Sequence, residues 1–93
     1  MEKIIFDFKK IKNKKDFYNK LSEKVDLPTY FGNNLDALWD VITSEEIDLP
    51  VEIVFVNFNK NKNKFFSSLE KLFTDAEKEM NKRLIFKICD EEK

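Results

Sequence analysis

The chain of 93 residues contains no histidine, one cysteine and one glycine. Without histidine it lacks the most common general base and the most common metal ligand of proteins. Its single cysteine, Cys89, can form no internal disulfide and provides too few soft ligands for a zinc site. One glycine cannot build a glycine-rich phosphate loop. We therefore expect a protein that is not an enzyme and that uses neither a metal ion nor a cofactor.

Long apolar runs are also missing. No stretch approaches the roughly 18 apolar residues that a membrane-spanning helix needs. The N-terminal segment turns polar at Asp7, which is too early for the core of a signal peptide. Ten phenylalanines, with only one glycine and two prolines, argue against disorder. The length predicts a single domain, residues 1–93. The apolar surroundings of Cys89 indicate a buried, unreactive thiol. The lack of a membrane run, a signal-peptide core and a possible disulfide favours the cytoplasm.

Basic residues are absent from the middle third of the chain. Residues 25–56 contain seven acidic residues and no basic one, whereas residues 1–24 contain eight lysines and four acidic residues. Residues 57–93 contain nine basic and seven acidic residues. A segregated acidic block repels nucleic acid and anionic membranes, so it predicts a cationic partner. The lysines of the first third are scattered over expected loops and helices, and we interpret them as solubilising.

The stretch from Tyr30 to Thr43 holds the only glycine and the only tryptophan, and the rest of the chain is organised around it. We expect Gly32 to supply a positive φ in the turn before a helix. Asn34 suits the N-cap, because its side-chain oxygen can accept a hydrogen bond from a free backbone N–H. The apolar residues of the helix recur at the spacing of one face, and they are Leu35, Leu38, Trp39 and Ile42.

A second side of this helix is acidic. Asp36, Asp40 and Thr43 share a stripe roughly 110° from the apolar one, at about 100° per residue. Asp36 lies at the positive end of the helix dipole, which favours a negative charge. Asp40 lies four residues later, and the two carboxylates repel each other by roughly 0.2–0.5 kcal/mol. Glu45 and Glu46 follow at the end where the dipole disfavours anions, and no basic residue lies near them in the sequence. A solvated surface explains Asp36 well and Asp40 less well, so a solvated and a partner-binding surface both stay open.

Periodicity and turn residues predict the element order β-α-α-β-(α)-α-β, in which the helix in parentheses is a short turn within the polar residues 57–64. Parallel strands need crossovers of this length, and such crossovers are right-handed. The fold class is therefore α/β, a small two-layer sandwich in which a three-stranded parallel sheet packs against three to four helices. The second strand is apolar enough to be buried on both faces. The expected strands are residues 3–8, 51–56 and 83–89, and the expected longer helices are residues 13–25, 34–43 and 65–81.

Residues 28–40 read P-T-Y-F-G-N-N-L-D-A-L-W-D and closely resemble the signature of the barstar family, P-x-Y-(Y/F)-G-x-N-L-D-A-L-W-D. The element order and the chain length agree with that family over nearly all of the rest. Members of the family are intracellular inhibitors of extracellular ribonucleases of the barnase type. The resemblance implies the same parallel-sheet fold. It also implies a bacterial inhibitor, or immunity protein, whose acidic helix and adjoining loop bind a basic ribonuclease or nuclease toxin.

The resemblance further implies roles for single residues. Asp40 would anchor the complex by taking the place of a substrate phosphate among the catalytic arginines and histidine of the nuclease. Asp36 would pair with a second basic group, and Tyr30 would stack beside the histidine. An outlying contact falls at Asp75, where the family has the longer glutamate. The implied partner-binding residues are Tyr30, Phe31, Gly32, Asn34, Leu35, Asp36, Trp39, Asp40, Thr43 and Asp75.

Some alternatives stay open. The family's namesake carries a tryptophan just after the acidic helix, whereas this chain has Ser44-Glu45-Glu46 and one extra residue before Pro50. Whether this loop contacts the partner is therefore undecided. An acidic interaction module that binds a basic protein other than a nuclease would present the same surface. An enzyme that used Asp36 and Asp40 as an acid and base pair would need a pocket beside them. The free protein is expected to be a monomer that binds neither nucleic acid nor membrane.

Overall fold

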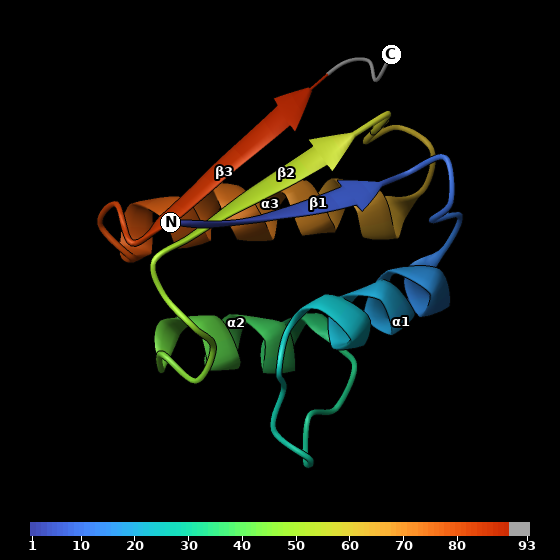
Figure 1. The fold of residues 1–93 in the computed structure, drawn as a ribbon. Coiled ribbons are helices and arrows are strands. Elements are labelled where there is room, and N and C mark those ends of the chain that lie inside the picture. The colour runs from blue at the N-terminus through green and yellow to red at the C-terminus, as the bar shows by residue number, and fades with distance from the viewer. Residues whose placement is uncertain (90–93) are drawn as a thin grey trace.

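The computed structural model describes residues 1–89, which form one three-stranded parallel sheet and three helices (Figure 1). The strand order is β1-β2-β3, so β2 is central. This architecture confirms the predicted α/β sandwich. Within residues 1–89 no helix has the length and apolar character that crossing a bilayer requires. The elements are β1 (Glu2–Asp7), α1 (Lys14–Lys24), α2 (Leu35–Thr43), β2 (Val51–Val56), α3 (Lys64–Glu79) and β3 (Leu84–Cys89).

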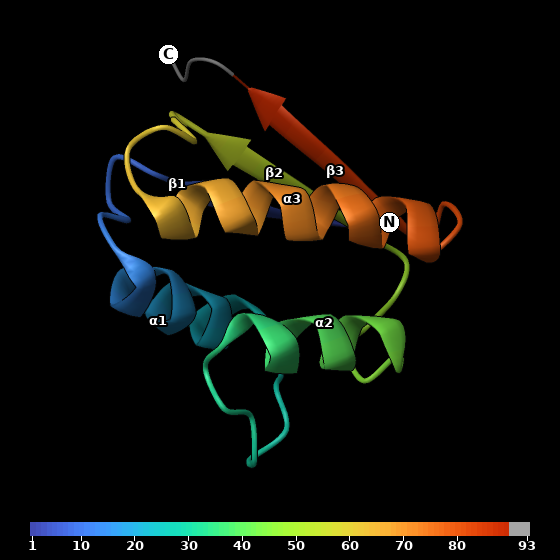
Figure 2. The same cartoon turned by 180° about the vertical axis from the view of Figure 1, so that it is seen from behind.

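All three helices of the described chain lie on one face of the sheet. Figure 1 shows the strands in front of α3 with α1 and α2 below them, and Figure 2 shows α3 in front when the molecule is seen from behind. The strand order explains this arrangement. Both crossovers move in the same direction across the sheet, and right-handed crossovers then place their helices on the same face.

The opposite face of the sheet carries no helix within residues 1–89. Val54 and Val56 on this face of β2 are nevertheless buried, at 5% and 3% exposure, because β1 and β3 flank them. The expected burial of the second strand on both faces is therefore confirmed. Cys89 pairs in register with Val56 and is exposed. The expectation of a buried thiol is wrong, because Cys89 lies on the helix-free face of an edge strand.

The core is largely aromatic. Phe55, near the centre of the sheet, is completely buried, and its ring centroid lies 5.9 Å from that of Phe6 and 5.5 Å from that of Phe73. Edge-to-face pairs of this kind add about 0.5–1.5 kcal/mol beyond the burial of their area. Phe58 joins the cluster, with its centroid 4.8 Å from that of Phe8 and 5.0 Å from that of Phe55. A residue expected in a polar turn is thus partly buried and packs against the core.

The optional short helix in residues 57–64 is absent from the described chain. Asn57 has a φ of 57°, in the left-handed region. The side-chain oxygen of Asn59 accepts a hydrogen bond from the N–H of Asn61 at 2.9 Å. Side-chain bonds of this kind favour a turn over a helix. α3 begins only after Asn63, whose side chain caps it by accepting the N–H three residues later at 2.8 Å.

α3 and β3 are both shorter than predicted. α3 ends at Glu79 and β3 begins at Leu84, one or two residues inside the expected bounds. Between them, Asn81 and Lys82 have φ values of 52° and 75°. These values lie in the left-handed region, which neither a helix nor a strand of L-residues uses. The connection therefore separates the two elements sharply.

Two polar contacts hold the edge strand β3. On the helix side, Glu77 Oε2 of α3 accepts a hydrogen bond from the N–H of Phe86 at 3.2 Å. On the helix-free face, Lys87 Nζ lies 3.2 Å from Glu52 Oε2 of β2. β3 is thereby tied to the helix layer as well as to the central strand.

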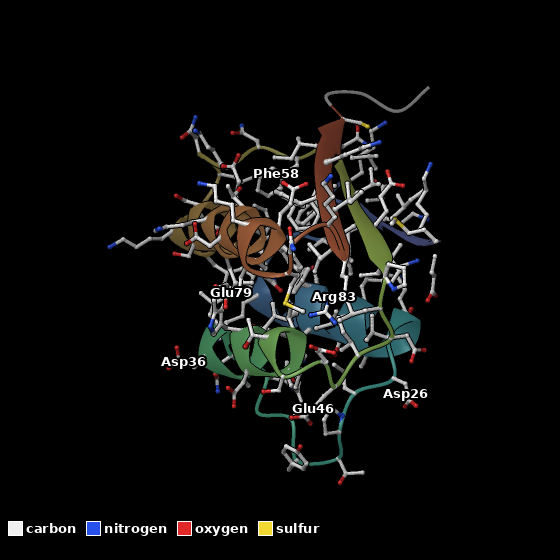
Figure 3. All side chains as sticks on the ribbon, turned by 90° about the vertical axis from the view of Figure 1, so that its left-hand side faces the viewer. Asp26, Asp36, Glu46, Phe58, Glu79 and Arg83 are labelled. Carbon is white, nitrogen blue, oxygen red and sulfur yellow. The ribbon has the colours of Figure 1, made fainter. Side chains whose placement is uncertain are left out.

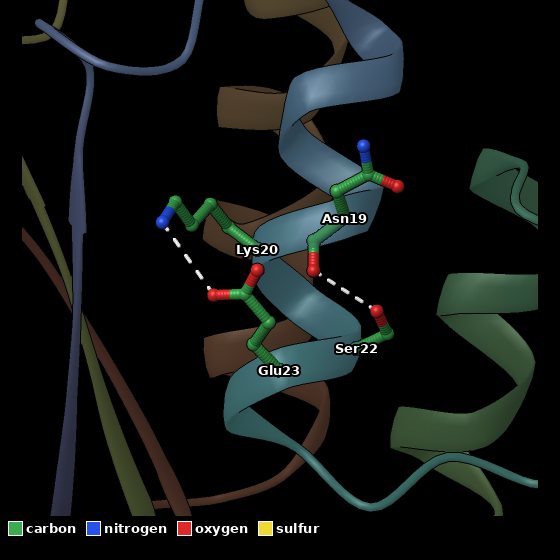
Figure 4. Close-up of polar contacts among 4 residues, drawn as sticks. All are labelled: Asn19, Lys20, Ser22 and Glu23. Atoms are coloured by element: carbon green, nitrogen blue, oxygen red, sulfur yellow. Dashed lines mark hydrogen bonds and ion pairs between the residues drawn. The ribbon is translucent and has the colours of Figure 1, made fainter.

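The polar contacts of α1 lie on its surface. Asn13 caps the helix by accepting the N–H three residues later at 2.9 Å. Lys20 Nζ lies 3.5 Å from Glu23 Oε1, and Ser22 Oγ donates to the carbonyl of Asn19 at 2.9 Å (Figure 4). Exposed ion pairs contribute only about 0–1 kcal/mol each. In Figure 4, Lys20 and Glu23 lie on the side of α1 turned away from α2.

Candidate partner-binding site

α2 begins where the sequence predicts, but the turn before it differs. Asn34 is the N-cap, and its Oδ1 accepts the N–H of Ala37 at 2.8 Å. The positive φ expected at Gly32 is found at Asn33 instead, at 53°, and asparagine tolerates this region well. At Gly32 a side chain would be crowded. Asn34 Nδ2 donates to the Gly32 carbonyl at 3.3 Å, and a Cβ on Gly32 would lie 3.1 Å from that nitrogen.

The apolar face of α2 is rotated relative to the prediction. Leu38, Val41 and Ile42 are buried, whereas Leu35 and Trp39 are only partly buried and pack at the edge of the core. Val41 thus takes a core position that periodicity gave to Trp39. Leu35 and Trp39 instead line a groove between α2 and the neighbouring helix α3.

This shallow groove between α2 and α3 brings together residues that are distant in sequence. Asp36 and Trp39 line it from α2, and Lys71 and Asp75 line it from α3. Lys71 Nζ lies 3.1 Å from Asp75 Oδ2, and both side chains are exposed, so the pair contributes about 0–1 kcal/mol. The structure therefore places Asp75 at the same groove as Asp36, but with a cation beside it. Asp40 does not line this groove.

Two other expected site residues make contacts inside the protein. Thr43 Oγ1 donates a hydrogen bond to the carbonyl of Trp39 at 2.9 Å, one turn back in the helix. Phe31 is partly buried, and its ring centroid lies 6.0 Å from that of the core residue Tyr18. Phe31 therefore supports the loop from the inside, whereas the adjacent Tyr30 is 74% exposed.

Tyr30 is tied to the chain that follows α2. Its hydroxyl donates a hydrogen bond to Glu46 Oε1. This hydrogen bond raises the pKa of the Tyr30 hydroxyl above its usual value, and partial desolvation and the charges of Glu46 and Asp40 act in the same direction. Glu46 was not among the predicted site residues. It lies 16 residues from Tyr30, so no local pattern could have paired them.

The expectation that no basic residue offsets the carboxylates of Glu45 and Glu46 is wrong for Glu45, which Arg83 binds. Arg83 makes two parallel contacts with Glu45, from Nη1 to Oε1 at 2.8 Å and from Nη2 to Oε2 at 2.8 Å. These contacts lower the pKa of the Glu45 carboxyl and raise that of the Arg83 guanidinium. The two residues are 38 positions apart, and folding brings the connection between α3 and β3 to the end of α2 (Figure 3).

We call the surface formed by Tyr30, Asp36, Asp40 and Glu46 the acidic face. All four residues are exposed, and none of them takes part in an ion pair within residues 1–89. Figure 3 shows Asp36 and Glu46 beside and below α2, in the half of the molecule away from the sheet. Three carboxylates without a cation of their own can bind cationic groups from outside, and the tyrosine adds an aromatic ring and a hydroxyl.

The sequence is similar to proteins whose names concern ribonuclease inhibition. The family model described as "Barstar (barnase inhibitor)" matches residues 1–90. The "Putative ribonuclease inhibitor YrdF" of Bacillus subtilis strain 168 is 45% identical over 58 residues, which are 62% of this chain and 63% of that protein. The chain thus matches less than two thirds of the length of that relative. Because the family model matches nearly the whole chain, the protein belongs to the barstar family.

Proposed function

We propose that this protein inhibits a basic, barnase-type ribonuclease by covering its active site with the acidic face. The observation that carries the proposal is the exposed group of three carboxylates, Asp36, Asp40 and Glu46, which have no cation of their own within residues 1–89. A ribonuclease active site is built to hold phosphate among cationic groups. A rigid helix that presents carboxylates at such a site competes with the substrate directly.

The distribution of charge over the fold supports this direction of approach. The lysines of residues 9–15 and 60–64 lie in the loops that follow β1 and β2 and in the first turns of α1 and α3. These segments lie together at the opposite end of the strands from the α2–β2 connection (Figure 1). A basic partner is repelled by the lysine-rich end and attracted by the acidic face. Such asymmetry speeds encounter and orients the partners before contact.

Within this proposal each site residue has a role. Asp40, near Tyr30, takes the place of the substrate phosphate, and Asp36 binds a second cationic group at the rim of the active site. Tyr30 stacks on the nuclease. Asp75 contacts the nuclease after its ion pair with Lys71 has been broken. The remaining contact and supporting residues are Phe31, Gly32, Asn34, Leu35, Trp39 and Thr43. The inhibitor acts as a monomer in the cytoplasm and serves as an immunity protein against a nuclease toxin.

The test is the activity of a barnase-type ribonuclease titrated with this protein at low and at physiological salt. We expect stoichiometric inhibition by the wild type, which weakens as salt screens the charges. Asp40→Ala should weaken inhibition at least about 30-fold, as expected for an interface anchor worth about 2 kcal/mol or more. Glu23→Ala is the matched control. It removes one exposed carboxylate from the side of α1 turned away from α2 and should leave inhibition unchanged.

Inhibition that Asp40→Ala leaves intact would refute the proposed site. Salt-dependent binding of a basic protein without any loss of ribonuclease activity would instead support an acidic interaction module. An enzyme with Asp36 and Asp40 as its acid and base is not favoured, because only Asp36 lines the neighbouring groove.

A further inference from the structure

The end of α2 has an unusual residue in a strained position. The N–H of Glu45 donates to the carbonyl of Ile42 at 3.1 Å, and the N–H of Glu46 donates to the carbonyl of Val41 at 2.9 Å. This pair of bonds is a Schellman motif, in which the residue at the position of Glu45 must be left-handed and is usually glycine. Glu45 has a φ of 62° and carries a full side chain. A residue with a Cβ is less favourable there than glycine, so contacts that fix its side chain help to maintain the turn.

Arg83 provides that support from outside the acidic face. Its guanidinium holds both oxygens of Glu45 at 2.8 Å, the planar geometry that gives the strongest and most directional ion pairs. The backbone of Arg83 is itself fixed, because its carbonyl accepts the N–H of Val51 at 2.9 Å at the start of β2. The turn after α2 is thus fastened to the sheet through one arginine side chain.

The fixed turn determines where the next residue points. Glu46 follows Glu45 directly, and its Oε1 accepts the hydroxyl hydrogen of Tyr30. Tyr30 is 74% exposed and lies in the loop before α2. The hydrogen bond therefore links the loop before α2 to the turn after it. Figure 3 shows Arg83 above the turn that carries Glu46, between the sheet and the acidic face.

We propose that Arg83 and Glu45 are positioning residues that hold Glu46 against Tyr30, and that the Tyr30–Glu46 pair is a specificity-determining part of the partner-binding surface. This inference rests on the proposed function. It gives Glu46 a specific role within the acidic face and adds Glu45 and Arg83 as the residues that hold it in place. The Tyr30 hydroxyl donates to Oε1 of Glu46, which leaves Oε2 for a partner, and Asp40 lies close enough to influence the same hydroxyl. Closely spaced oxygen acceptors fit the donor fork of an arginine, so the pair selects a partner that places a guanidinium there.

The positioning step can be tested without any nuclease. In a Tyr18→Phe background Tyr30 is the only tyrosine, and its ionisation can be followed by ultraviolet absorbance. The groups that face its hydroxyl are Glu46 and Asp40. Removing a cation by Arg83→Gln would by charge alone raise the pKa of Tyr30. Loss of the Glu46 hydrogen bond would lower it toward the ordinary value, and we expect the pKa to fall.

Two further variants separate geometry from charge in this titration. Arg83→Lys keeps the positive charge but cannot form the fork, so it should lower the pKa of Tyr30 as Arg83→Gln does. Lys87→Gln is the matched control, because it removes one cation and one ion pair, that with Glu52, on the helix-free face of the sheet. It should leave the pKa of Tyr30 unchanged. A pKa that rises or stays constant in Arg83→Gln would overturn the positioning role.

The binding step is tested by a double-mutant cycle on ribonuclease inhibition. We expect Arg83→Gln to weaken inhibition by about threefold to tenfold when Tyr30 is present, and to have no effect in a Tyr30→Ala background. Glu46→Ala also removes a direct contact with the partner, so it should weaken inhibition in both backgrounds, and by more when Tyr30 is present. Strictly additive effects would overturn the role of the pair in binding. If the wild type inhibits no ribonuclease, the proposed function fails, and with it the binding role, whereas the tyrosine titration still decides whether Arg83 positions Tyr30.

Discussion

The hydroxyl of Tyr18 gives the sharpest prediction about stability. Tyr18 lies on α1 with 3% of its surface exposed, and its hydroxyl has no hydrogen-bond partner within residues 1–89. Its ring packs against Phe17, Phe31 and Phe65, with centroid distances of 5.3, 6.0 and 5.8 Å. Leaving a buried polar group unpaired costs about 1–3 kcal/mol. Tyr18→Phe keeps the ring and removes that cost, so it should stabilise the protein by about 1 kcal/mol at pH 8.

The same burial makes the effect depend on pH. Burial raises the pKa of Tyr18 to about 12, compared with 10.0 for an ordinary tyrosine. Between these values the unfolded chain has lost the phenolic proton while the folded protein retains it. Stability therefore falls as the pH rises above 10, by about 1.4 kcal/mol per pH unit from this group. Phenylalanine has no such proton, so the advantage of Tyr18→Phe should grow above pH 10.

Urea unfolding at pH 8 and at pH 10.5–11 measures both effects. In thermal unfolding at pH 8, the same gain of about 1 kcal/mol would appear as a rise of roughly 4–8 °C in Tm for a domain of this size. Tyr30→Phe is the control, because it removes an exposed hydroxyl and should change stability by less than about 0.5 kcal/mol at pH 8. If Tyr18→Phe is less stable than the wild type and shows the same dependence on pH, the hydroxyl has a partner and the reasoning is refuted.

Two further predictions follow from residues whose surroundings the sequence did not reveal. Phe58→Ala should destabilise the protein by about 2–3 kcal/mol in urea unfolding, because this partly buried ring packs against Phe8 and Phe55. Asn61→Ala in the same turn is the control and should cost less than about 0.5 kcal/mol. Equal effects of the two substitutions would contradict the packing of Phe58 against the core. Cys89 should react with a thiol reagent such as dithionitrobenzoate nearly as fast in native protein as in urea, since it is exposed; strong protection in the native state would show that this face is covered.

The features that the sequence predicted correctly depend on residues close together in the chain. An asparagine followed by an amphipathic run placed the start of α2 at Leu35, and the asparagine does cap that helix. Three strands separated by helices were sufficient to predict a parallel sheet. The predictions were wrong where contacts with distant parts of the chain determine which side chains are buried. Val41 is buried, whereas Leu35 and Trp39 line the groove between α2 and α3. Cys89 is exposed because it lies on the helix-free face of an edge strand.

The site shows the same division. Asp36 and Asp40 could be singled out from helical spacing alone, because both lie on one helix. The partners of Glu45 and Glu46 lie 38 and 16 residues away, and no periodic pattern connects residues at such separations. The sequence did suggest that uncompensated anions at a helix end were anomalous. That anomaly was a valid signal that a distant cation was needed, and Arg83 is that cation for Glu45.

The hydrogen bond from the Phe86 N–H to Glu77 concerns how copies of this protein behave toward one another. An edge strand with free N–H groups is a template on which another chain can add a strand, and crowded proteins aggregate by this route. At β3 a second chain would find this donor already occupied and would meet a negative charge held by α3. Under the proposed function, each molecule must keep its acidic face free to bind its partner. Glu77 lies on the side of α3 opposite the groove with α2. It thereby discourages the pairing of β3 with another chain, which would lead to aggregation.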